Sequence, residues 1–223
     1  MQSFVSVGPS GPVLRRLGEE GLCIVELGHR TQGEIAAILA ALNLLAAARG
    51  RRSRQRLLRR AIERTRGFSE VCRLLAEPIG RRIDAGAAIE RLCVGLTAGR
   101  EAVIGSSLVL DVPRVQVDGV TARRLLLVAA ELVGNAVRHA LEDRLGTIRV
   151  SLHVNGAGVS LEICDDGPGL LDALEDGPGA GTLIIHEVVR RAGGMMRRAS
   201  GPQGTRVRVV LPRHEIGRVE DSS

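Results

Sequence analysis

The chain has 223 residues, a formal net charge of +6 and an apolar content of 44%. This length has room for one large domain or two small ones, with enough apolar residues for a real core. All basic residues are Arg, and Trp and Tyr are absent, so the aromatic side chains on which single-stranded nucleic acids stack are nearly missing. We therefore expect no nucleic acid partner.

Compartment and membrane contact follow from the cysteines and the hydropathy pattern. The longest apolar run, residues 35–48, is shorter than the roughly 20 residues that a membrane helix needs. The N-terminus has no basic-then-apolar pattern of a signal peptide. The cysteines show neither C-x-x-C pairing nor metal-ligand spacing, which indicates buried thiols in a reducing compartment: Cys23, Cys72, Cys93 and Cys164. We expect a cytoplasmic protein without membrane contact.

The first part of the chain predicts a helical hairpin. Residues 1–18, with several Gly and Pro, predict a flexible N-terminal segment. In residues 19–48 and again in 58–75, apolar side chains recur in steps of four and three, typical of helices with a heptad seam. Two such helices cannot bury their stripes alone, so residues 19–77 predict a hairpin that dimerises into a four-helix bundle. The seam positions are Ile24, Gly28, Thr31, Ile35, Ile38, Leu42 and Leu45, then Leu58, Ala61, Thr65, Phe68, Cys72 and Leu75.

After a linker at residues 78–84, the pattern changes to alternating helices and strands. Asn155-Gly156 predicts a tight hairpin turn, and residues 213–223 predict a polar tail. The fold class is therefore α+β, a helical hairpin followed by an α/β sandwich over residues 84–212. The predicted helices are 85–99, 121–141 and 182–192, and the predicted strands are 108–112, 115–117, 147–154, 158–164, 195–199 and 205–211.

The predicted helix at 121–141 carries a row of polar groups. Glu131, Asn135 and Arg138 stand at i, i+4 and i+7, on one side of the helix. Gly134, in mid-helix, costs about 1 kcal/mol relative to Ala, which indicates that another group must come close. An amide oxygen, a carboxylate and a guanidinium suit a hydrated Mg²⁺ and a polyphosphate. Taken alone, the row favours the plainer interpretation, the solvated face of an amphipathic helix.

Three glycine-rich motifs follow in order. A strand-like run ends in Asp165-Asp166-Gly167-Pro168-Gly169, Gly179-Ala180-Gly181-Thr182 opens a helix, and Gly204-Thr205 precedes the last strand. With the polar row, these motifs resemble the N, G1 and G2 boxes and the final Gly-Thr of the GHKL ATPases, which include histidine kinases, gyrase, the heat-shock chaperone and MutL. The resemblance covers residues 84–212 and implies a GHKL (Bergerat) ATP-binding domain.

The resemblance assigns roles to individual residues. It implies ATP and Mg²⁺ as cofactors, with Asn135 as the Mg²⁺ ligand and Glu131 as a catalytic residue. Asp165 would accept a hydrogen bond from the adenine amino group, and the glycines would let the backbone approach the nucleotide. The expected nucleotide-binding residues are Asn135, Arg138, His139, Asp165, Gly167, Gly169, Gly179, Gly181, Thr182 and Thr205.

The segment Glu26-Leu27-Gly28-His29-Arg30 resembles the phospho-acceptor box of histidine kinases. It is similar to the HWE kinases and their relatives, in which Arg follows the histidine, although their Trp is missing. Because a guanidinium cannot act as a base, Glu26, one helical turn before His29, is the expected proton acceptor. Without the ATPase motifs, His29 would be an ordinary exposed helix residue.

We therefore expect a histidine kinase of a two-component system, in which ATP phosphorylates His29 and an aspartate of a response regulator receiver takes the phosphoryl group. One alternative is a phosphotransfer adaptor that binds no ATP, which the short lid between Gly169 and Gly179 favours. The other is a GHKL serine kinase of the anti-sigma type, a family without a phospho-acceptor hairpin.

Overall fold

Residues 19–76 form a helical hairpin. In the computed structural model, which describes residues 18–76, 82–98, 107–140, 146–156, 158–169 and 180–212, helix α1 spans Glu19–Ala47 and helix α2 spans Arg51–Ala76. Gly50, between them, has a φ of 103°, in a region that favours glycine, and the chain reverses there. The predicted N-terminal segment, most of the linker, the lid at 170–179 and the tail lie outside the described residues.

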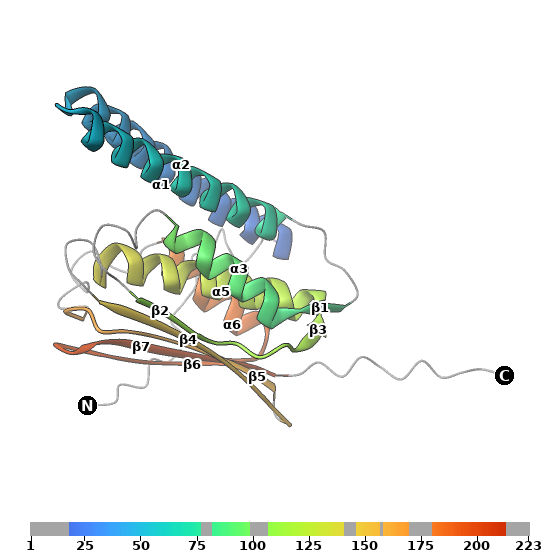
Figure 1. Ribbon diagram of the computed structural model, residues 1–223. Helices are drawn as coiled ribbons and strands as arrows, with labels where there is room; N and C mark the ends of the chain where they lie inside the picture. The colour runs from blue at the N-terminus through green and yellow to red at the C-terminus, as the bar shows by residue number, and fades with distance from the viewer. Residues whose placement is uncertain are drawn as a thin grey trace.

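Burial along α1 changes from its base to its tip. Leu22, Cys23 and Glu26 are buried near its start, whereas Ile35 and Leu42, further along, are 53% and 51% exposed. Figure 1 shows the base of the hairpin against the other helices and its tip extending beyond them. The predicted seam is therefore only partly covered within one chain. Thr31, Ile38 and Leu45 are half-buried, while Ile24, Ile35, Leu42 and Leu58 are exposed.

A second helical layer lies between the hairpin and a sheet. It consists of α3 (Ala85–Thr97), α5 (Gly119–Asn135) and α6 (Ala180–Arg191), as Figure 1 shows. Between residues 119 and 134, most side chains of α5 are buried, polar ones included. A helix that is covered on nearly all sides belongs to the core, so the rest of this domain is organised around α5.

The five-stranded sheet has the order β2-β4-β5-β7-β6. Strand β2 runs parallel to β4, and the other neighbours are antiparallel. Strands β1 (Arg82–Asp84) and β3 (Gln116–Asp118) form a separate antiparallel pair. The bounds in the large sheet are β2 Ser107–Asp111, β4 Thr147–Asn155, β5 Gly158–Asp165, β6 Met195–Gly201 and β7 Gly204–Pro212.

The helix predicted at 121–141 differs from the structure at both ends. Asp118 caps α5, since its carboxylate accepts hydrogen bonds from the backbone N–H and the hydroxyl of Thr121 (2.9 and 2.6 Å). After Asn135 the helix widens into a π-helical turn, Ala136–Ala140. Such turns often occur at functional sites, and this one begins directly after the predicted Mg²⁺ ligand.

The fold class is confirmed as α+β, with a helical hairpin before an α/β sandwich. The core runs from Leu22 and Val71 in the hairpin through α5 to the inner face of the sheet, where Val150 and Leu161 are fully buried. The predicted turn at Asn155-Gly156 is shifted, because Asn155 pairs with Gly158 and belongs to the strand. Among the helices of the described ranges, none has the length and apolar character to cross a membrane.

Candidate functional site

The polar row at the end of α5 forms a connected cluster. Nη2 of Arg138 donates a hydrogen bond to Oδ1 of Asn135 (2.6 Å) and lies 3.5 Å from Oε1 of Glu131. Glu131 is buried, whereas Asn135 and Arg138 are half-buried. The structure thus brings the three residues together at the point where α5 widens into the π-helical turn.

Glu131 has a further partner that sequence reasoning missed. Nη2 of Arg30, on α1, lies 3.6 Å from Oε2 of Glu131, and Nε of Arg30 donates to Oε1 of Glu26. All three side chains are buried. A Cβ at Gly134 would lie 3.0 Å from Nη1 of Arg30, so the group that needs space beside mid-helix Gly134 is this guanidinium. In the sequence, the mid-helix glycine indicated a close contact but did not identify the contacting residue.

Gly181 brings the start of α6 onto the same cluster. A Cβ at Gly181 would overlap the carboxylate of Glu131, so only glycine allows the two helices to approach this closely. Thr182 follows in the first turn of α6 and is half-buried. The second glycine motif therefore lies directly against the polar row on α5.

Asp165 lies at the end of β5, opposite Thr205 on β7. Its Oδ1 accepts hydrogen bonds from the backbone N–H groups of Gly167 (3.0 Å) and Thr205 (3.2 Å). The hydroxyl of Thr205 is 3.0 Å from that of Ser200, a residue that the sequence did not single out. These bonds hold one carboxylate oxygen in a fixed direction where β5 ends.

The glycines after Asp165 shape the loop. Gly169 has a φ of 76°, in the left-handed region, and a Cβ there would also overlap the backbone of Gly201. Gly167 is buried. Gly179, an expected nucleotide-binding residue, lies outside the described residues, as does the lid that precedes it.

Two predicted site histidines are placed by their backbone only. His29 lies on α1 and His139 lies in the π-helical turn, and the side chains of both are outside the described part. Glu26, the expected proton acceptor, is fully buried and pairs with Arg30. The structure therefore assigns Glu26 a partner that the sequence did not predict.

The cluster fits the metal that the fold implies. Asn135 is half-buried, and its amide oxygen accepts from Arg138 in this structure. Oε2 of Glu131 is buried without a hydrogen bond from any described residue. A Mg²⁺ ion that keeps waters and phosphate ligands needs only one or two such oxygens from the protein. The described residues contain no cluster of three His, Cys, Asp or Glu side chains able to hold a metal by themselves.

The cysteines and the remaining described histidines stay outside the cluster. Cys23 and Cys93 are buried, as predicted, and burial raises the pKa of Cys93 to about 12, so it remains a thiol. Cys72 and Cys164 are only half-buried, contrary to the prediction. His186 is buried on α6, and His153 is exposed on β4.

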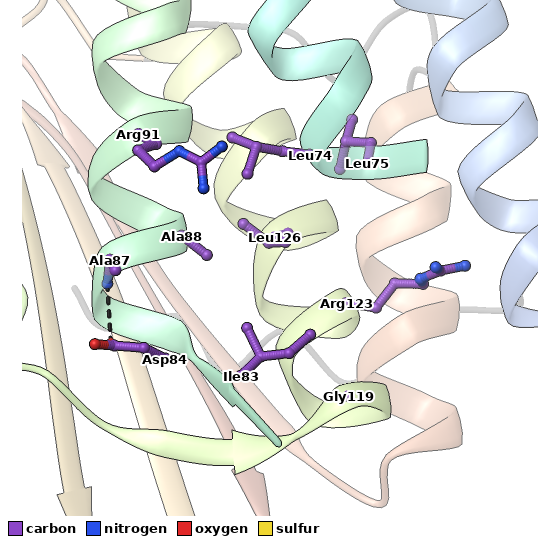
Figure 2. A pocket seen from close by; sticks show the side chains of 10 residues that line it. All are labelled: Leu74, Leu75, Ile83, Asp84, Ala87, Ala88, Arg91, Gly119, Arg123 and Leu126. Carbon is purple, nitrogen blue, oxygen red and sulfur yellow. Dashed lines mark hydrogen bonds between the residues drawn. The ribbon is translucent and has the colours of Figure 1, made fainter. Parts of the chain in front are cut away.

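A small pocket of about 210 Å³ lies where the end of α2 meets β1, α3 and the start of α5 (Figure 2). Its floor is apolar, and two arginines stand at its sides. It contains none of the predicted site residues. The lining consists of Leu74, Leu75, Ile83, Asp84, Ala87, Ala88, Arg91, Gly119, Arg123 and Leu126.

Fold and site together define an ATPase-type α/β sandwich preceded by a helical hairpin. Residues 120–215 match the family described as histidine kinase-, DNA gyrase B-, and HSP90-like ATPase. The chain is also similar to the C4-dicarboxylate transport sensor protein DctB of Rhizobium meliloti (strain 1021), with 31% identity over 143 residues. That match covers 52% of this chain and spans only 23% of the relative's length.

Solved structures share the fold. The histidine kinase domain of the blue-light activated kinase EL346 from Erythrobacter litoralis superposes with a TM-score of 0.57 at 20% identity, covering 78% of this chain and 93% of that chain. A bacterial phosphotransferase gives a TM-score of 0.59 at 15% identity, covering 93% of this chain and 100% of that one. Residues 120–215 thus match the histidine kinase-like ATPase family, and most of the chain shares its fold with these solved structures.

Proposed function

We propose that the chain is an ATP-dependent protein histidine kinase that phosphorylates His29 and passes the phosphoryl group to an aspartate of a response regulator receiver. The observation that carries this proposal is the cluster of Glu131, Asn135 and Arg138 beside the base of the phospho-acceptor helix. Glu131 joins this cluster to the histidine box through its buried ion pair with Arg30. The proposed parts are the hairpin at 19–77 and the ATP-binding domain at 84–212, flanked by segments 1–18 and 213–223.

In this proposal, each end of the site has its own task. Asp165 accepts a hydrogen bond from the adenine amino group, while Thr205 and Gly167 hold its carboxylate in place. Asn135 holds Mg²⁺, which would neutralise phosphate charge when bound. Arg138 is half-buried beside Asn135 and is suited to pair with a phosphate instead of the amide. The remaining nucleotide contacts are assigned to His139, Gly169, Gly179, Gly181 and Thr182.

The chemical step is attack by one ring nitrogen of His29 on the γ-phosphorus. A P–N bond forms, the bond between the γ-phosphorus and the bridging oxygen breaks, and ADP leaves with the electron pair. Glu26 is assigned to take the proton of the second ring nitrogen, one helical turn away. Oε1 of Glu26 already pairs with Nε of Arg30. For this role, either the other carboxylate oxygen of Glu26 takes the proton or the Glu26–Arg30 ion pair moves.

The exposed apolar side chains of the hairpin support a homodimer. Ile35, Leu39 and Leu42 on α1 are 53%, 56% and 51% exposed, and Leu58 on α2 is 47% exposed. Contiguous exposed apolar surface of this kind marks an interaction site. A second copy of the hairpin would cover it in a four-helix bundle.

A phosphotransfer adaptor without ATP binding is the second candidate, and one contact favours it. The amide oxygen that would bind Mg²⁺ already accepts a 2.6 Å hydrogen bond from Arg138. If Arg138 keeps this hydrogen bond, Asn135 does not bind Mg²⁺, and the domain would act without ATP.

One experiment distinguishes the candidates: purified protein is incubated with Mg²⁺ and γ-labelled ATP, and any protein-bound label is tested for acid lability. The kinase predicts acid-labile label, and the adaptor predicts none without a phosphorylated donor. Acid-stable label would identify a serine kinase of the anti-sigma type and overturn the proposal.

A further inference from the structure

The turn of α1 that carries the phospho-acceptor is attached to the nucleotide site of its own chain. Arg30 directly follows His29, and its guanidinium lies between Glu26 on the same helix and Glu131 on α5. Adjacent Cα atoms are only 3.8 Å apart. The backbone of His29 is therefore held one residue away from an anchor in the polar cluster.

Two glycines make this attachment possible. At Gly134 a Cβ would lie 3.0 Å from the guanidinium of Arg30, and at Gly181 it would overlap the Glu131 carboxylate. Glycine in mid-helix lowers helix stability, so its presence at 134 is explained by the arginine that lies against it. The space for Arg30 is built into the ATPase domain.

The rest of the hairpin is attached to the same domain. A Cβ at Gly95 of α3 would lie 2.8 Å from the backbone oxygen of Gly67 on α2, so these helices touch through their backbones. Nearby, Nη2 of Arg91 on α3 is 2.6 Å from Oε1 of Glu70 on α2. Both helices of the hairpin therefore have fitted contacts within one chain.

A row of charges crosses the attachment. Glu26, Arg30, Glu131 and Arg138 alternate in sign from α1 to the π-helical turn, and all except Arg138 are buried. Each carboxylate of the row therefore lies next to a guanidinium of the same chain. If His29 reacted at the nucleotide site of another chain, α1 would have to leave α5, and Arg30 and Glu131 would separate.

We propose that Arg30 is a positioning residue and that phosphoryl transfer to His29 occurs in cis, from the nucleotide bound by the same chain. Arg30 fixes the His29 turn against Glu131, next to Asn135. The inference rests on the proposed kinase function and adds which chain donates the phosphoryl group. If the unmutated protein takes up no label from ATP, the kinase function itself fails, before the cis route is tested.

Transfer in cis is tested with a pair of variants, one without the acceptor histidine and one with an impaired nucleotide site. His29→Ala and Asp165→Asn chains, carrying different tags, are co-expressed, purified through both tags and incubated with γ-labelled ATP. Transfer in cis predicts no label, because neither chain has both an acceptor and an intact nucleotide site. Label on the Asp165→Asn chain would overturn the proposal. A tagged pair of unmutated and His29→Ala chains is the control, and it should be labelled on the unmutated chain.

If no mixed pair is recovered because the chains stay monomeric, the two variants are mixed at increasing concentration. Transfer in cis again predicts no label at any concentration. Label that grows with concentration would show transfer between chains and would overturn the proposal.

The positioning role of Arg30 is tested by measuring both the maximal labelling rate and the ATP affinity of Arg30 variants. Arg30→Gln should lower the maximal labelling rate at saturating ATP by roughly 10²-fold, the effect of a small misplacement of a reacting group, with ATP affinity unchanged. Arg30→Lys, which keeps the charge, should recover part of the rate. The matched control is Arg64→Gln, which removes an ion pair within the hairpin (Arg64 Nε to Glu34 Oε1, 2.7 Å) and should leave the rate unchanged.

Gly134→Ala tests the same contact if Arg30→Gln does not fold. The new methyl group would lie 3.0 Å from Nη1 of Arg30 and shift the guanidinium by a few tenths of an ångström. It keeps every charge and improves helix propensity. A slower labelling rate in a protein of undiminished thermal stability is expected. A rate equal to that of the unmutated protein would show that the contact does not position His29.

Discussion

Asp165 accepts a hydrogen bond from the backbone N–H of Thr205, 3.2 Å away, and thereby joins the end of β5 to the start of β7. The same oxygen accepts from Gly167 at 3.0 Å. Two strands and one loop therefore hold the carboxylate that is proposed to accept from the adenine amino group. This arrangement leads to the first prediction.

Asp165→Asn should lower ATP affinity by roughly 10- to 150-fold, because the adenine amino donor loses a charged acceptor worth about 1.5–3 kcal/mol. Calorimetry with ATP and Mg²⁺ measures the loss. Asp166→Asn is the matched control, since Asp166 is exposed and its Oδ1 accepts from the backbone N–H of Thr147 at 2.8 Å. Equal affinities in the two variants would refute the role of Asp165.

Asn135→Ala should retain part of the ATP affinity but lose its dependence on Mg²⁺. The amide oxygen is the proposed metal ligand, and its removal also frees Arg138 to pair with phosphate. Titration of ATP with and without EDTA measures the difference. If Asn135→Ala binds ATP with the Mg²⁺ dependence of the unmutated protein, the metal is held by other groups.

His29→Ala should take up no label from ATP and still bind the nucleotide, because the acceptor is removed and the ATPase domain is intact. Glu26→Gln should slow labelling by about 10²–10⁴, the range for a positioned general base. Labelling kinetics at saturating ATP test both variants. Label that persists in His29→Ala, or that resists acid, would contradict the assignment.

Leu42→Glu should dissociate the proposed dimer, because this side chain is 51% exposed in one chain and would be buried between two. Each such apolar side chain contributes about 1.5–3 kcal/mol when it is buried. Light scattering at micromolar concentration gives the mass. Val154→Glu, at a 40% exposed position on β4, is the control and should keep the mass of the unmutated protein. A monomeric unmutated protein would rule out the dimer.

The stability of the ATPase domain should fall in mild acid because of His186. Burial, together with the nearby positive charge of Arg198, lowers the pKa of His186. Below the ordinary histidine pKa of about 6.5, the unfolded chain takes up a proton that the folded chain refuses, so stability is present above this pH and lost below it. His186→Gln should weaken this pH dependence of the urea midpoint, whereas the exposed His153→Gln should not.

The element pattern and the order of the motifs were predictable from the sequence, because both depend on local chemistry. Apolar spacing identified both hairpin helices, and Gly50 marked the turn between them. The strand before Asp165 and the helix after Gly181 were found from alternation and helical periodicity. Helix ends were less accurate, because the cap at Asp118 and the π-helical turn at Ala136 depend on local hydrogen bonds that periodicity does not report.

Contacts between distant segments were decided only by the tertiary structure. The sequence indicated that a group must approach Gly134, but Arg30 lies more than a hundred positions earlier, and no local pattern links the two. The same holds for Glu131 against Gly181 and for the parallel pairing of β2 with β4. The sequence alone determined which residues are candidates for the chemistry, since side-chain type and spacing are local properties. The packing of the hairpin on α5 decided which of them come into contact. A buried charge is unfavourable unless it is paired, and here the partners lie far apart in the chain.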